Sequence, residues 1–181
     1  MLTEVEKKEL VRIARQSLRS AVKRTPKPKL EPLTDTLKEQ RGAFVTLKKH
    51  GNLRGCIGYI EAVKPLYLAV AEMAVSAGMR DPRFSPVEED ELPDVTIEIS
   101  VLSPLKQVKG VEDIEVGRDG IYIVKHHYSG VLLPQVATEY KWDSETFLEE
   151  TCLKAGLPTD AWRRGAKVYT FSAEIFGEES G

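Results

Sequence analysis

Strand-like segments of this chain come mostly as pairs joined by short turns, with helical patterns between the pairs. Residues 42–47 and 53–60 form the first predicted hairpin. Residues 114–124 form a second predicted hairpin, which turns at Asp119-Gly120. Strands joined by tight turns run antiparallel, whereas parallel strands need long crossover connections. We therefore expect an α+β fold in which helices pack on antiparallel β-sheets.

The remaining elements are predicted from apolar periodicity and from residues that start or stop helices. Thr3 and Glu6 fit a capping box at the start of a long first helix, and the prolines from Pro26 onward end it. Residues 95–102 alternate apolar with mostly polar positions and give the clearest strand. Further helices are expected at residues 65–78, at residues 144–155 and, as a short one, after Pro134, followed by a last strand at residues 168–176.

The composition is that of a soluble globular protein. Of its 181 residues 41% are hydrophobic, and 26 basic against 28 acidic side chains leave a net charge of −2. This length fits a single domain over residues 1–181, or two small lobes that share a core. The longest apolar run, at residues 66–71, is far shorter than the roughly 20 residues of a membrane span. With no signal-peptide pattern and only two cysteines, we expect a cytoplasmic protein.

The segment most suggestive of chemistry is Leu-Arg-Gly-Cys-Ile-Gly at residues 53–58. Glycine weakens a strand, so Gly55 and Gly58 on either side of Cys56 need a reason. One reason is access of a ligand to Cys56, and the other is a bulge or tight helix packing around a buried, inert cysteine. Arg54 is expected on the same strand face as Cys56, where its charge would favour the nucleophilic thiolate or bind an anion.

Two other segments hold polar residues that fit a binding or acid–base role. Gln135 and Glu139 are four residues apart and would share a helix face, either within a site or as solvated surface. Arg80, Asp81 and Arg83 surround a proline, and they would either clamp an anion or cap the preceding helix.

The histidines and cysteines do not indicate a metal site. His50 lies in the first predicted turn, and the adjacent His126 and His127 would face opposite sides of a strand. Cys56 and Cys152 are far apart, and no paired metal-ligand spacing is present. We expect no metal, and the sequence indicates no particular cofactor.

A basic stripe follows the first predicted helix. Its members recur at helical spacing and are Lys8, Arg12, Arg15, Arg19 and Lys23. Such a stripe would suit nucleic-acid phosphates, but the neighbouring sequence lacks the aromatic residues that single-strand binders interleave with their basic ones. A solvated helix face is the favoured interpretation.

Several of these segments together resemble the AMMECR-one domain family. The matching motifs are the hexapeptide at residues 53–58, Asp-Pro-Arg-Phe at 81–84, the strand at 95–102 with Ser103-Pro104 after it, Leu-Leu-Pro-Gln-Val-Ala at 132–137, Glu139, Trp142, residues 147–148 and residues 154–157. The resemblance covers nearly the whole chain in the family's order, and the hexapeptide is its most specific mark.

The resemblance implies an α+β protein in which a larger and a smaller lobe meet at a cleft. It also implies a functional association with Memo-like proteins and radical S-adenosylmethionine proteins, which are often encoded beside microbial members. The family has no agreed reaction, so the resemblance gives no substrate.

Three functions fit these observations. The favoured one is a small-molecule or catalytic cleft with Cys56 and Glu139 as catalytic residues. Its expected binding residues are Arg54, Gly55, Gly58, Arg83 and Gln135. The second is a non-catalytic adaptor that offers the same residues to a protein partner. The third, nucleic-acid binding through the first helix, ranks last, and we expect no membrane partner.

Overall fold

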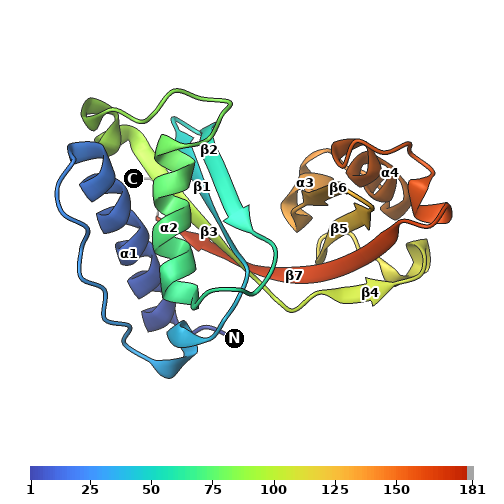
Figure 1. The fold of residues 1–181 in the computed structure, drawn as a ribbon, viewed down its shortest axis with the longest axis horizontal. Coiled ribbons are helices and arrows are strands. Elements are labelled where there is room, and N and C mark those ends of the chain that lie inside the picture. Colours follow the sequence, from blue (N-terminus) through green and yellow to red (C-terminus); the bar gives the residue numbers. More distant parts are fainter. Residues whose placement is uncertain (179–181) are drawn as a thin grey trace. The chain divides into compact units, whose positions relative to one another are not determined.

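The computed structural model describes residues 1–178 and consists of two compact units. The first unit contains Met1–Leu102 together with the segment that starts at Glu174, and the second is Ser103–Ala173. Both units combine helices with β-strands (Figure 1). The strand pairs with an assigned register are antiparallel. The predicted α+β class with antiparallel sheet is therefore confirmed.

The first unit packs two helices on one face of a sheet. Its helices and strands are, in chain order, α1 (Glu4–Lys23), β1 (Ala43–Lys49), β2 (Asn52–Tyr59), α2 (Leu66–Met79) and β3 (Val95–Leu102), with 3₁₀ turns at Asp35–Lys38 and Glu89–Asp94. Helices α1 and α2 lie side by side and cover the strands (Figure 1). Strand β1 lies between β2 and β3, so β2 is the outermost strand of this sheet. The predicted hairpin of residues 42–60 is confirmed as β1 and β2.

Helix α1 begins and ends as its sequence predicts. The Thr3 hydroxyl accepts a hydrogen bond from the Glu6 amide at 3.2 Å, and the Glu6 carboxylate accepts one from the Thr3 amide at 3.1 Å. These two bonds satisfy donors that the first turn would otherwise leave open. The helix ends at Lys23, after which Arg24 adopts the left-handed conformation with a φ of 58°.

Part of the basic stripe on α1 is held in bonds within the first unit. The ion pairs join Arg12 to Glu9, Arg15 to Glu178 and Lys23 to Glu89. Arg15 also donates to the main-chain oxygen of Leu92 at 3.1 Å. Because these contacts use charge that phosphates would need, nucleic-acid binding stays the least favoured of the three predictions.

The second unit combines short strands with two helices. Its elements are β4 (Lys106–Val108), a 3₁₀ turn at Val111–Asp113, β5 (Asp119–Lys125), β6 (Tyr128–Leu132), α3 (Pro134–Glu139), α4 (Ser144–Lys154), a 3₁₀ turn at Ala161–Arg163 and β7 (Lys167–Gly177). The first part of β7 pairs with both β4 and β5, and β5 also pairs with β6. The end of β7, from Glu174, belongs to the first unit, where it lies beside β3.

The prediction of the second hairpin was wrong about the strand that pairs with residues 121–124. Residues 114–116 form no strand, and β5 instead pairs with β6 across a turn at His126 and His127. His126 makes this turn with a φ of 56°. Gly120 lies inside β5, where an added Cβ would come 2.3 Å from the ring of Phe171. The glycine is therefore needed for packing within the strand and does not mark a turn.

Within residues 1–178, no helix combines the length and the apolar character needed to cross a membrane.

Candidate functional site

Cys56 lies on the outermost strand of the first unit, opposite Thr46 of β1. The Cys56 Sγ is 3.2 Å from the Thr46 Oγ1, and Cys56 is half-buried whereas Thr46 is buried. In an antiparallel pair, facing residues whose side chains lie this close are those whose main-chain groups point away from each other. The amide and carbonyl groups of Cys56 therefore point outward, toward the edge of the sheet.

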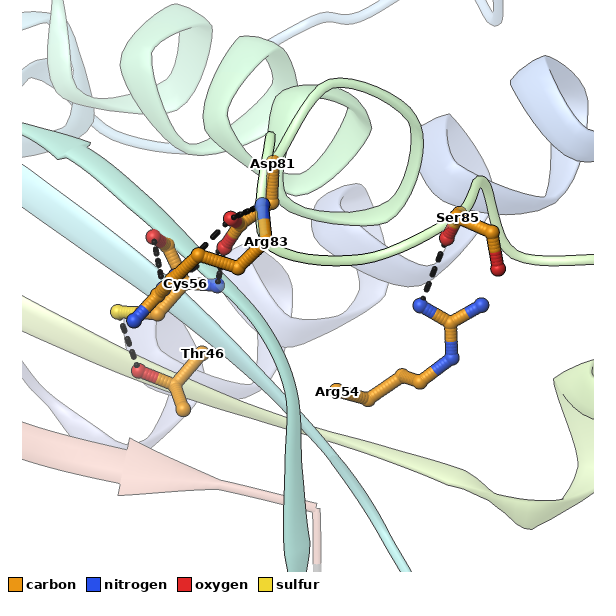
Figure 2. A network of polar contacts seen from close by, with 6 residues as sticks. All are labelled: Thr46, Arg54, Cys56, Asp81, Arg83 and Ser85. Atoms are coloured by element: carbon orange, nitrogen blue, oxygen red, sulfur yellow. Dashed lines mark hydrogen bonds and ion pairs between the residues drawn. The ribbon is translucent and has the colours of Figure 1, made fainter.

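Asp81 and Arg83 satisfy these outward main-chain groups. The Cys56 amide donates to the Asp81 Oδ2 at 3.0 Å, and the Arg83 guanidinium donates to the Cys56 carbonyl oxygen at 3.4 Å (Figure 2). Two side chains from the segment after α2 thus make the hydrogen bonds that a further strand would make at this point. Exposed strand edges attract other strands, so this arrangement also protects the sheet edge.

Asp81 is the anchor of this arrangement. Its side chain lies almost wholly inside the unit, with the residue 4% exposed, and its Oδ1 accepts bonds from the Arg83 amide and Nε, each at 3.0 Å. The Arg83 Nη2 donates to the Asp81 Oδ2 at 2.8 Å, which makes the ion pair bidentate. The bonds from Arg83, more than any other contact, hold the pKa of Asp81 far below its usual range. One charged carboxylate therefore binds both Cys56 and Arg83.

Arg83 is the cation beside Cys56. Its hydrogen bond to Asp81 raises the pKa of the Arg83 guanidinium, and the nearby Cys56 side chain adds to the rise. The guanidinium end of the Arg83 side chain points toward the Cys56 sulfur (Figure 2). Because the Arg83 side chain is 53% exposed, it also reaches solvent, where an anion could contact it.

Arg54 does not occupy the position that the sequence predicted for it. The pairing of β1 with β2 shifts between Leu47 and Lys48, so Arg54 is an extra residue in a bulge. A bulge interrupts the alternation of side chains along a strand, and the two-residue spacing to Cys56 then no longer fixes a common face. Figure 2 shows the Arg54 guanidinium apart from Cys56 and close to Ser85.

The partner of Arg54 is Glu91. The Arg54 Nε and Nη2 donate to the two Glu91 carboxylate oxygens at 3.0 and 3.1 Å, and Nη1 donates to the Ser85 main-chain oxygen at 2.9 Å. These bonds are the main reason that the pKa of Glu91 is lowered, to about 2. Glu91, which also accepts a bond from Lys49 at 3.0 Å, thus holds Arg54 at Ser85, and Arg83 takes the place at Cys56 that we expected for Arg54.

The two glycines beside Cys56 are required by packing. A Cβ added to Gly55 would lie 2.0 Å from the main-chain oxygen of Ala77 in α2, and one added to Gly58 would lie 2.3 Å from the Phe44 ring. Tight helix packing, one of the two reasons considered for these glycines, is therefore present. A binding role for Gly55 and Gly58 stays a prediction.

Gln135 and Glu139 belong to α3 of the second unit. The Gln135 Oε1 is buried and has no hydrogen-bond partner among residues 1–178, whereas Glu139 is exposed. The expected cleft that would join them to Cys56 stays a prediction, as do their binding and catalytic roles.

The histidines lie in hairpin turns. His50 is in the turn between β1 and β2, His126 and His127 are in the turn between β5 and β6, and all three are exposed. Among the residues that the structure describes, no three histidine, cysteine or acidic side chains are grouped to hold a metal ion.

The sequence analysis did not single out Thr46, and it named Asp81 only as part of an anion clamp or a helix cap. Thr46 carries no recognisable signal because a threonine in a strand is common. Asp81 does carry a signal, since an acidic and a basic residue flank Pro82, a pattern that fits an anion clamp or a helix cap. Its actual role is to bind the edge of β2 and the Arg83 side chain.

Comparison with known proteins matches almost the whole chain to one family. The AMMECR1 family profile matches residues 11–176. A protein of Methanothermobacter thermautotrophicus is 46% identical over 186 residues, which cover 98% of this chain and 97% of the relative. A protein of Thermococcus kodakarensis is 47% identical over 184 residues, which cover 94% of this chain and 89% of the relative.

A solved structure supports the same assignment. The crystal structure of an uncharacterised protein from Pyrococcus horikoshii superposes with a TM-score of 0.94 and 40% sequence identity. The match covers 98% of this chain and 94% of that chain. The names of these relatives state no activity, so they identify a family and not a reaction. The chain belongs to the AMMECR1 family.

Proposed function

We propose that the first unit carries a reactive-thiol site in which Cys56 is the nucleophile and Arg83 binds the anionic part of a small molecule. One observation carries the proposal: Asp81 accepts a hydrogen bond from the Cys56 amide and also forms the bidentate pair with Arg83. A single buried carboxylate therefore fixes the thiol and the cation in relation to each other.

The chemistry of these groups suits a thiolate nucleophile. The thiolate is the reactive form of cysteine, and a neighbouring cation favours it over the thiol. Thr46 adds a hydroxyl 3.2 Å from the sulfur, which is able to donate a hydrogen bond to the thiolate. The exposed part of the Arg83 guanidinium is left to meet a carboxylate or phosphate group of the ligand.

Other predicted parts of the site are retained as proposals. Glu139 would act as an acid or base and Gln135 as a polar contact, provided that α3 faces the same ligand. The association with Memo-like and radical S-adenosylmethionine proteins would make such a thiol part of a pathway shared with them. Both ideas depend on the reactivity of Cys56.

The first test compares the two arginines through the reactivity of Cys56. The rate of alkylation of Cys56 by iodoacetamide is measured against pH by mass spectrometry of the Cys56 peptide in the native protein. Arg83→Met should slow the reaction about tenfold at neutral pH, because losing a nearby cation raises the pKa of a thiol. Arg54→Met is the matched control and should leave the pH dependence unchanged, since Glu91 holds that arginine.

The second test asks whether Arg83 attracts anions. The ratio of the alkylation rates with iodoacetate and iodoacetamide should fall in Arg83→Met and stay close to the wild-type value in Arg83→Lys, which keeps the charge. The proposal is wrong if Arg54→Met slows the reaction as much as Arg83→Met. It is also wrong if Cys56 reacts only when the protein unfolds, and that outcome would favour the adaptor function.

A further inference from the structure

The strands of the second unit have their helices on one face only. Ile121 and Ile123 of β5 are wholly buried in the core that also contains Phe147 and Leu148 of α4. Side chains alternate along a strand, so Tyr122, which lies between the two isoleucines, belongs to the opposite face. Helices α3 and α4 contact the strands through this same core and therefore pack on the side away from Tyr122.

The strand register brings two tyrosines together on the opposite face. Tyr122 is paired with Tyr169 of β7, and the centroids of the two rings are 6.0 Å apart with an interplanar angle of 35°. Gln107 of β4 is paired with Tyr169 on its other side, and Lys167 precedes Tyr169 by two residues along β7. The Cα atoms of Gln107 and Lys167 are therefore about 5 Å and about 7 Å from that of Tyr169. We call the surface formed by these four side chains the tyrosine face.

The side chains of the tyrosine face are accessible from solvent. Gln107 and Lys167 are exposed, and both tyrosines are partly exposed. Within residues 1–178, no hydrogen bond or ion pair holds the Gln107 amide, the Lys167 ammonium or either tyrosine hydroxyl. The tyrosine hydroxyls are not buried either, because the buried and unpaired side-chain atoms of this part of the chain belong to Ser100 and Gln135. All four side chains are therefore able to contact a ligand.

The charge on the tyrosine face suits an anion. Asp119 is the only acidic residue of β4, β5, β6 and residues 167–173 of β7, all of which lie in the described part of the chain. Asp119 shares the buried face of Ile121, and Arg118 donates to its two carboxylate oxygens at 2.9 and 3.0 Å. Lys167 therefore has no carboxylate of these strands beside it, and its charge is left for an anionic group of a ligand.

We propose that the tyrosine face binds a free nucleotide. The base stacks on Tyr122 and Tyr169, Lys167 binds the phosphate, and Gln107 forms hydrogen bonds with the edge of the base. Aromatic side chains accept any base because every base has a π-face, and a glutamine amide offers a base edge one donor and one acceptor. This site belongs to the second unit and does not depend on the reactivity of Cys56.

A structural role of the tyrosine pair would explain only part of this arrangement. Cross-strand aromatic pairs stabilise a sheet, which accounts for the contact between the two rings. The pair alone does not supply a cation and an amide on two sides of the same ring, and with them the face offers the three kinds of contact that a nucleotide needs. One cation suits the phosphate of a single nucleotide, whereas a nucleic-acid strand is held through several phosphates.

The test measures the binding of AMP to the full chain by ligand-observed NMR titration at low salt. Adenosine, which lacks the phosphate, and ribose 5-phosphate, which lacks the base, are titrated in the same way. Wild-type protein should bind AMP more tightly than either of them, because each partial ligand loses one set of contacts.

Variants assign these contacts to the tyrosine face. Tyr169→Leu should weaken the binding of AMP and of adenosine about tenfold, because the base loses a stacking partner. Lys167→Gln should weaken AMP about threefold and leave adenosine unchanged, whereas Lys167→Arg should keep the affinity for AMP. Tyr140→Leu is the matched control and should change neither affinity, since it alters an exposed tyrosine of the same unit that stacks on Trp142.

Several outcomes would overturn the proposal. One is that wild-type protein does not bind AMP, and another is that it binds ribose 5-phosphate equally well, which would mean an anion site without base stacking. A loss in Tyr140→Leu that matches the loss in Tyr169→Leu would contradict the tyrosine face as the site. A short adenylate strand that binds more than about tenfold tighter than AMP would make a nucleic-acid strand the occupant. Thermal unfolding checks each variant, and the exposed Lys167 still tests the proposal if Tyr169→Leu does not fold.

Discussion

The two cysteines of this chain lie in opposite kinds of surroundings. Cys56 is on an outermost strand, half-buried, with its sulfur at the Thr46 hydroxyl and its amide bound by Asp81. Cys152 of α4 has no exposed surface and lies in the apolar core of the second unit. Burial raises the pKa of the Cys152 thiol. The comparison teaches that the location of a cysteine, at a polar sheet edge or within a core, decides whether it can serve chemistry.

The largest expected effect is the difference in reactivity between the two thiols. In the folded protein at neutral pH, Cys56 should be alkylated at least about 100-fold faster than Cys152, because a wholly buried thiol reacts only through local unfolding. Peptide mass spectrometry after timed quenching measures both rates in one sample. Similar rates for the two cysteines would break the comparison.

Asp81→Asn tests whether the Asp81 carboxylate anchors Cys56 at the edge of the sheet. The variant should lose about 2 kcal/mol of the free energy of unfolding, because a buried carboxylate that binds an arginine and two amides becomes neutral. Urea denaturation of the full chain measures this loss. Asp35→Asn changes an exposed acid in the same unit and should cost almost nothing, so an equal loss in both variants would contradict the anchoring role.

Serine substitutions extend the comparison of the two cysteines to the free energy of unfolding. Cys152→Ser should cost about 1–2 kcal/mol, because it places a hydroxyl among apolar side chains such as Phe147 and Leu148. Cys56→Ser should change stability by less than about 0.5 kcal/mol, since Thr46 is able to bond a hydroxyl. Thermal unfolding of both variants gives the two values, and the reverse order would mean that Cys56 is the structural cysteine.

The smallest expected effect concerns acid. Arg54 lowers the pKa of Glu91 to about 2 in the folded protein, below the 4.5 of an unperturbed glutamate. A lowered folded pKa contributes stability above the unfolded value, and this contribution is lost as the pH falls from about 4.5 toward 2. Glu91→Gln should therefore weaken the pH dependence of unfolding in that window by about 1 kcal/mol.

Hydrogen exchange of the β2 amides at several pH values gives the same comparison locally. Glu31→Gln, which changes an exposed glutamate in a long surface pair with Lys29, serves as the control. An unchanged acid response in Glu91→Gln would show that Arg54 and Glu91 do not stabilise the hairpin that carries Cys56.

Local signals were enough to predict much of the first unit. The capping box at Thr3 and the alternation of residues 95–102 depend on neighbours in the sequence, and both predictions are confirmed. The second hairpin was mispredicted because Asp119-Gly120 looks like a turn. Only the contact of Gly120 with Phe171, 51 positions later in the chain, explains why the glycine is inside a strand.

The candidate site could be predicted only in part for the same reason. The segment around Cys56 was correctly placed in a strand, since its pattern is local. The bulge at Arg54 and the bond from Cys56 to Asp81 depend on how distant segments pack, and periodicity carries no information about either. The choice between Arg54 and Arg83 therefore needed the structure.

The way β7 returns to the first unit has a consequence for synthesis on the ribosome. The Ser103 amide donates to the Ser172 main-chain oxygen at 2.9 Å, so the two ends of the second unit lie next to each other in space. The segment after it supplies Glu174 to the Leu2 amide and Glu178 to Arg15. At about 5–20 residues per second, the nascent first unit waits on the order of 5 seconds for these last contacts. During that interval the sheet that carries Cys56 still lacks the strand that completes it beside β3.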